Sequence, residues 1–336
     1  MAIFSQDQSQ VSWQYETGTY ATPTGTSQWP GHVQSHNPSE DTGVNKKVIR
    51  YIGAGDRSLS TFIDGPSSYA GTLSYFPTDW KILKFALGKN ADAGSPSPYT
   101  HTISEANSDN SNGEIAQQVL PSFSVEDAQR VLIAGSGLNL IRTYKGCIVD
   151  SFSMNMAEGE PISVEVGYTA KTVDFSSGTI ATVTAATTSP FLWEHTLINL
   201  AGTKLNTVKS STFSIKNNLD APHYVDNTIN ISTPIPKARD YEMTLNLNAD
   251  SSRTNEIYNQ YFIGGSTFNV DIFSAVGSAT NDILIAMSGC KLTGFSDTSA
   301  TEGVVEHVLT IIPKNVSVIV DDAIQFYNAG SYAGTV

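Results

Sequence analysis

The fold of this chain follows from two similar stretches of sequence, GCIVDSFS at residues 146–153 and GCKLTGFS at residues 289–296. Each stretch opens with a glycine and one of the chain's two cysteines, Cys147 and Cys290, which are 290 − 147 = 143 residues apart. A shared pattern at a fixed offset indicates an internal repeat. The two stretches therefore predict that the chain contains two copies of one structural unit.

Two more pairs of short motifs keep nearly the same offset. FSV at residues 123–125 corresponds to FNV at residues 268–270, with an offset of 268 − 123 = 145. EG at residues 158–159 corresponds to EG at residues 302–303, with an offset of 302 − 158 = 144. A single match could arise by chance, but three matches in the same order favour a duplication.

The same local elements are predicted in each half. Apolar residues alternate along 69–75 and along 241–247, which is the spacing of a half-buried strand. Each run is followed by a short segment, 78–88 or 250–265, that begins with a helix-capping residue and ends at glycine, so a short helix is predicted there. Alternating residues on both sides of the turn at 158–161 predict a hairpin.

The two halves differ in the length of one connection. Gly88 and Gly146 are 146 − 88 = 58 residues apart, but Gly264 and Gly289 are only 289 − 264 = 25 apart, so the first half carries 58 − 25 = 33 extra residues. We assign most of them to residues 89–116, which are rich in Asn, Ser, Asp and Gly. Because so polar a stretch cannot bury enough apolar surface to fold alone, we expect a long loop that is available to order against a neighbour.

These patterns divide the chain into five parts. They are an N-terminal arm (1–45), a first β domain (46–172), a linker (173–192), a second β domain (193–325) and a C-terminal tail (326–336). The linker is assigned on its content of Thr, Ala, Ser and Gly.

Charge limits the kinds of partner that the chain can bind. Its 336 residues carry a net charge of −13, and only 15% of them are charged, well below the quarter that is usual for soluble globular chains. Tight binding of nucleic acid is not expected, because duplex phosphates attract Lys and Arg. A negative surface can still surround DNA without holding it, since it repels phosphate.

No residue is predicted to be catalytic, to bind a cofactor or to ligate a metal. Among the six histidines, His32 and His36 are four residues apart, but the prolines around them argue against a shared helix face. The glycine-rich segments 53–56 and 135–137 lack the strand, helix start and lysine of a phosphate-binding loop.

Two further pairs of residues are candidates for chemistry. Cys147 and Cys290 lie in predicted strands, where buried cysteine behaves as a small hydrophobic residue, so core packing is preferred to reactivity. Glu158 and Glu160 could form a pair of glycosidase carboxylates, but such a pair must converge in a cleft, which sequence alone does not show. A membrane helix is not expected either, because no apolar run is long enough.

Several segments of the chain resemble one family of viral proteins. They are WQYETGTYA at 13–21, YKGCIVDSFS at 144–153 with EGEP at 158–161, FSIKNNL at 213–219 and IPKARDYE at 235–242. Over roughly residues 11–320 the sequence is similar to the tail tube proteins, or major tail proteins, of bacteriophages with long non-contractile tails.

That resemblance implies an all-β fold with short helices, built from two tandem tail-tube domains of the β-sandwich or barrel type. It implies a structural virion protein, made in the host cytoplasm and located in the tail, with no enzymatic activity and no cofactor. Because such tubes are stacks of rings of six units, a chain with two units would form a ring of three copies. The lumen would conduct DNA without specific binding.

The resemblance also implies partners. They are other copies of the chain, a tape measure protein, and tail terminator or baseplate proteins, with no membrane involved. The N-terminal arm and the loop at 89–116 are expected to contact stacked rings. Three alternatives stay open at this stage: a baseplate hub or distal tail protein, a β-rich adhesin or carbohydrate-binding module, and a glycoside-active enzyme.

Overall fold

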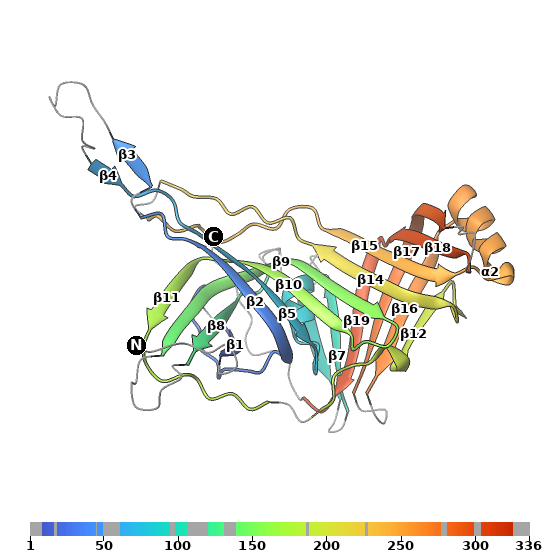
Figure 1. Ribbon diagram of the computed structural model, residues 1–336, viewed down its shortest axis with the longest axis horizontal. Helices are drawn as coiled ribbons and strands as arrows, with labels where there is room; N and C mark the ends of the chain where they lie inside the picture. The colour runs from blue at the N-terminus through green and yellow to red at the C-terminus, as the bar shows by residue number, and fades with distance from the viewer. Residues whose placement is uncertain are drawn as a thin grey trace.

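The protein is built almost entirely from antiparallel strands with a few short helices (Figure 1), which confirms the predicted all-β fold with short helices. The computed structural model describes residues 9–16, 19–44, 46–49, 61–94, 98–105, 120–130, 139–185, 188–225, 228–276, 281–298 and 304–324. One hydrophobic core contains residues from both halves of the chain, so the two predicted units share their interior.

Eight strands form a central sheet to which each half contributes four. In order of pairing these are β2 (His32–Asp41), β5 (Ser68–Phe76), β10 (Ser163–Ala170), the later part of β9 (Leu140–Ala157), β14 (Val208–Lys216), β15 (Asp240–Asn248), β18 (Glu306–Ile312) and the later part of β17 (Asp282–Thr298). The halves meet where β9 pairs with β14. We call this contact the internal interface.

The two sets of four strands match down to their irregularities. In the first half β9 has an extra residue at Asp150, and in the second half β17 has one at Thr293, an offset of 293 − 150 = 143. Likewise β2 has an extra residue at Gln34 and β14 at Lys209, an offset of 209 − 34 = 175. Matched bulges are typical of related domains, so the structure supports the duplication.

Each half also has an outer sheet. In the first half it contains β1 (Gln10–Tyr15), β8 (Phe123–Gln129), the early part of β9 and β11 (Thr172–Ser176). In the second half it contains β13 (Thr203–Lys204), β12 (Thr196–Leu200), β16 (Phe268–Ala275), the early part of β17 and β19 (Asn315–Asp322). A short helical turn, η4 (Trp193–His195), precedes β12.

The Gly-Cys motif lies where a long strand passes from the outer to the central sheet. Gly146 and Gly289 have φ angles of +66° and +62°, a conformation that costs other residues free energy. The cysteines that follow are fully buried and free, as predicted. Of the third repeated motif, the Glu158-Gly159 turn is present between β9 and β10, whereas residues 302–303 lie outside the described part of the chain.

The insertion in the first half differs from the loop that we predicted over 89–116. Its first part is a hairpin of β6 (Gly88–Ala93) and β7 (Tyr99–Glu105), and β7 pairs with β19 of the second half. His101 and Ile103 of β7 face the core. Most of the other residues of this strand are polar, so its sequence shows only a weak alternation of apolar and polar residues. The remainder, residues 106–119, lies outside the described residues.

The predicted arm and linker also contain paired strands. β1 and β2 lie within the predicted arm and pair with β8 and β5. β11 reaches into the predicted linker and pairs with β9. Both segments therefore contribute strands that pair with the strands of the domains.

The two predicted helices form, but their surroundings differ. In the first half all six residues of α1 (Ile82–Leu87) are buried, and Gly88 ends it with φ +104°. In the second half α2 (Ser251–Glu256) continues as a π-helical turn, η5 (Ile257–Ile263), of which only Ile257 and Tyr261 are buried. The second helix is thus left half uncovered.

Candidate assembly surfaces

One face of the central sheet packs on the core and the other is open. On the open side, Ser, Thr and Asn predominate along the strands, as in Ser151, Ser153 and Asn155 of β9. The charged residues at open-face positions are Asp41, Glu165, Asp240, Glu242 and Glu306, together with Lys209, Lys216 and Lys291. This face is therefore polar with a small excess of negative charge.

The two ends of the central sheet are unpaired among the described residues. β2 pairs only with β5, and the later part of β17 pairs only with β18. Exposed backbone N–H and C=O groups on such edges are templates for pairing with another chain. Both edges are therefore candidate contact surfaces.

Two long extensions project from one end of the central sheet. The first contains the hairpin of β3 (Lys47–Ile49) and β4 (Thr61–Ile63), and the second is the segment between β14 and β15; Figure 1 shows both reaching toward the same side. They contact each other where Ser67 N–H donates to Ile229 O at 2.8 Å and His223 Nε2 lies 2.8 Å from Ser67 O.

These extensions concentrate apolar side chains at the surface. Their exposed large hydrophobic residues are Val44, Val48, Phe62, Ile63, Tyr224, Val225, Ile229 and Ile235. Single exposed hydrophobic residues are ordinary, but a group of them on projecting segments indicates a surface for interaction with another protein.

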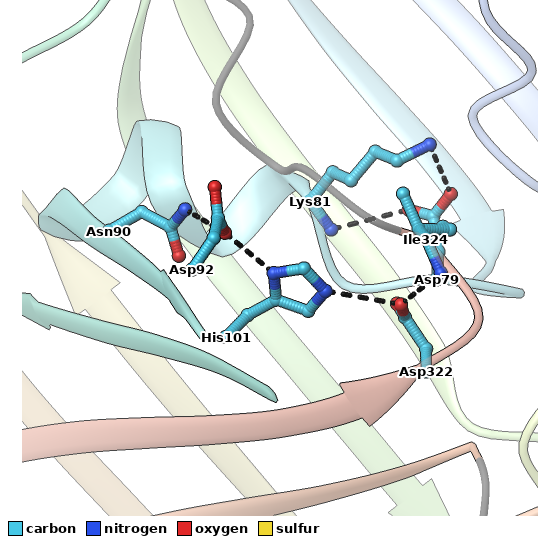
Figure 2. Close-up of polar contacts among 7 residues, drawn as sticks. All are labelled: Asp79, Lys81, Asn90, Asp92, His101, Asp322 and Ile324. Atoms are coloured by element: carbon cyan, nitrogen blue, oxygen red, sulfur yellow. Dashed lines mark hydrogen bonds and ion pairs between the residues drawn. The ribbon is translucent and has the colours of Figure 1, made fainter. Parts of the chain in front are cut away.

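A buried polar cluster holds the β6–β7 hairpin against the second half (Figure 2). His101 is fully buried; its Nδ1 lies 2.6 Å from Asp92 Oδ1 and its Nε2 lies 3.2 Å from Asp322 Oδ1. Asn90 Nδ2 also donates to Asp92 Oδ1, at 2.6 Å. Burial alone would lower the pKa of His101, but the hydrogen bonds with Asp322 and Asp92 outweigh it, so the pKa is raised.

This cluster links the two halves of the chain. Asp92 belongs to β6 and Asp322 to β19, so the imidazole bridges elements that are far apart in sequence. Nearby, Asp79 and Lys81 form an ion pair at 3.2 Å (Figure 2). Within the described ranges, no three His, Cys, Asp or Glu side chains are arranged to hold a metal ion.

Glu16 is a buried carboxylate whose role sequence reasoning missed. It accepts hydrogen bonds from Ser122 Oγ at 2.6 Å, from Gly146 N–H at 2.7 Å and from Ala21 N–H at 3.0 Å. It thereby fixes the WQYE segment, in which Trp13 and Tyr15 are core residues, to the bend of β9. The sequence could not predict this role, because a single glutamate in an aromatic motif does not indicate that its carboxylate is buried.

The other candidate residues for catalysis or metal binding do not converge on one site. His32 and His36 both belong to β2, and His36 contacts the Tyr168 hydroxyl at 2.7 Å and Asp127 at 3.5 Å. Glu158 and Glu160 lie exposed at the β9–β10 turn. Both glycine-rich segments, 53–56 and 135–137, fall outside the described residues.

No described helix combines the length and apolar composition required to span a membrane. Comparison with curated proteins found no match. The sequence profile of a family described as phage tail tube protein, in contrast, matches residues 9–332, nearly the whole chain. Because this match covers nearly all of the sequence, the chain belongs to the phage tail tube protein family.

Proposed function

We propose that three copies of this protein join edge to edge into a ring, and that stacked rings form a tube through which phage DNA leaves the virion. The observation that carries this proposal is the match between the internal interface and the two free edges. β17 is the counterpart of β9, and β2 is the counterpart of β14. If β9 pairs with β14 inside the chain, β17 of one copy can pair with β2 of the next in the same way.

The matched bulges give the register that we propose for this joint. At the internal interface Ser153 lies opposite Ser214. Adding 143 to the first and subtracting 175 from the second gives 153 + 143 = 296 and 214 − 175 = 39, so Ser296 would lie opposite Ser39 of the next copy. All four positions are serine, which suits close strand pairing at both joints.

The size of the resulting barrel favours three copies. Three copies supply 3 × 8 = 24 strands to one continuous sheet. With strands spaced about 4.8 Å apart and tilted by about 35–45°, such a barrel measures about 45–50 Å between opposite backbones. After side chains are added, it leaves room for one DNA duplex. A ring of six copies would have a barrel about twice as wide, which is wider than one DNA duplex requires.

The open face of the sheet would line this channel. Its Ser, Thr and Asn side chains offer no dense array of cations to phosphate, and its acidic residues outnumber its basic ones. Because each Lys or Arg contact to phosphate adds affinity and would retard movement, such a wall lets DNA pass without binding it. The lumen is therefore proposed to be a low-affinity surface.

The projecting extensions are proposed to contact the next ring in the stack. Both lie at one end of the sheet and carry exposed apolar side chains that a neighbouring ring would cover. By family membership, the ends of the tube would meet tail terminator and baseplate proteins, and a tape measure protein would occupy the lumen during assembly. The place of action is then the virion tail.

A cysteine pair tests the ring joint directly. The double variant Ser39→Cys, Ser296→Cys should form disulfides between copies under mild oxidation, giving covalent dimers and trimers on non-reducing gels. The matched control is Ser153→Cys, Ser214→Cys, which should form a disulfide within one chain and leave the mass unchanged. Absence of covalent multimers from Ser39→Cys, Ser296→Cys at concentrations where electron microscopy shows rings would refute the proposed joint.

A further inference from the structure

An open cavity of about 390 Å³ lies beside the free edge of β17. It is lined by Thr254, Asn255 and Tyr258 of the second helical segment and by Phe295, Asp297 and His307 of the sheet. Tyr258 and Phe295 meet edge to face with ring centroids 5.2 Å apart, and His307 Nδ1 lies 2.7 Å from Asp297 Oδ1. We call this site the edge cavity.

The first half has no corresponding opening among the described residues, because strand β14 covers the same place. Phe213 and Ile215 of β14 are fully buried, and Asn217 Nδ2 donates to Ala86 O of α1 at 3.1 Å. That coverage explains why α1 is wholly buried while Tyr258 of the second helix is 42% exposed. The edge cavity is the equivalent place with its covering strand missing.

We propose that the edge cavity receives strand β2 of the next copy, with Pro38 seated against its aromatic wall. This inference rests on the proposed ring and names the contact that specifies its joint. The register assigns the partners: 154 + 143 = 297 and 213 − 175 = 38 place Pro38 opposite Asp297, as Phe213 lies opposite Met154. Two residue pairs further along, beyond Ser39 and Ser296, Glu40 would lie opposite Phe295.

The side chains on the two edges suit this contact. Pro38 lies on the core-facing side of β2 and is half-buried in the lone chain, so it is available to a partner. Proline packs well on aromatic side chains such as Tyr258 and Phe295. Burial of these surfaces would complete the core of the second half, as β14 completes that of the first.

The missing backbone N–H of Pro38 gives the edge cavity a second role, which is to compensate for a lost hydrogen bond. Asn217 N–H donates to Asp150 O of β9, so alternate residues of β14, including Phe213, also direct their N–H groups toward β9. Pro38 occupies the position of Phe213 and has no N–H to donate. The joint between copies therefore has one ladder hydrogen bond fewer than the internal interface, and side-chain packing in the edge cavity compensates. This arrangement also disfavours pairing of β2 with unrelated strands.

Filling the edge cavity tests the inference separately from the ring itself. Asn255→Trp places a large side chain in the cavity from an exposed position, and Gln260→Trp, on the same helical segment but outside the cavity, is the matched control. Both changes are made in the Ser39→Cys, Ser296→Cys background. We expect Asn255→Trp to lower the yield of intermolecular disulfide at least tenfold, with Gln260→Trp unchanged and both chains folded by circular dichroism.

A second variant removes the aromatic wall instead of filling the cavity. Tyr258→Ala should reduce ring formation in the same assay by several-fold, because Pro38 loses its packing partner. If Asn255→Trp and Tyr258→Ala both cross-link as well as the parent, the edge cavity does not receive β2, although the ring joint stands. If the parent itself gives no cross-link, the ring joint fails first.

Discussion

The internal interface and the free edges of the central sheet are counterparts, yet they are built differently. At the internal interface, Met154, Phe213 and Ile215 form a fully buried apolar contact. At the free edges the corresponding residues are Asp297, Pro38 and Glu40. A contact formed during folding can be wholly apolar, whereas surfaces that remain exposed until assembly must stay soluble. The internal interface is therefore suited to forming during folding, and the free edges are suited to pairing later, in the proposed ring.

The largest expected effect on stability comes from truncating an apolar side chain at the internal interface. Phe213→Ala removes a fully buried ring from the internal interface and should lower the free energy of unfolding by about 3–5 kcal/mol. Pro38→Ala, at the corresponding free edge, should change the stability of the lone chain by less than about 1 kcal/mol while weakening ring formation. Urea denaturation of both variants measures the contrast, and equal losses of stability would contradict it.

A smaller effect should distinguish the two bends that deliver β9 and β17 to the central sheet. Alanine at either glycine must adopt a positive φ, which costs about 1–2 kcal/mol. At Gly146 the new Cβ would also meet the Tyr20 ring at 2.9 Å, whereas at Gly289 its nearest neighbour would be Lys314 Cβ at 3.2 Å. Gly146→Ala should therefore lower the melting temperature more than Gly289→Ala. The reverse order would show that the bend beside the free edge is the more constrained one.

The smallest effect concerns the second contact between halves, at His101. Because the folded pKa of this histidine is raised, its stabilising contribution is fully present below the ordinary histidine pKa and is lost as the pH rises through the folded value. The free energy of unfolding should thus fall with rising pH in the parent chain, and His101→Gln should flatten that dependence. An identical pH profile in both proteins would show that the cluster does not stabilise the contact through charge.

Sequence patterns predicted the elements that repeat and missed those that do not. The Gly-Cys pairs, the alternating strands and both helices were predicted because each half carries its own copy of the signal. The β6–β7 hairpin was missed because its stabilising partner, β19, lies more than 200 residues away and belongs to the other half. A polar strand that gains its stability from a distant partner has no local signature.

The assembly surfaces show the same limit. Apolar residues of the projecting extensions are visible in the sequence, but only the structure shows that two extensions from different halves lie together. The edge cavity could not be predicted, because Tyr258, Phe295 and His307 are brought together by the packing of a helix on a sheet edge.

The chain segment between β11 and β12 makes the two halves a single covalent body. Each separate body that joins an assembly loses translational and rotational freedom, at a cost of about 4–15 kcal/mol per association. A ring built from six independent halves would incur this loss five times, whereas the proposed ring of three fused chains incurs it twice. Fusion of the halves should therefore allow rings to close at lower protein concentrations, early after synthesis begins in an infected cell.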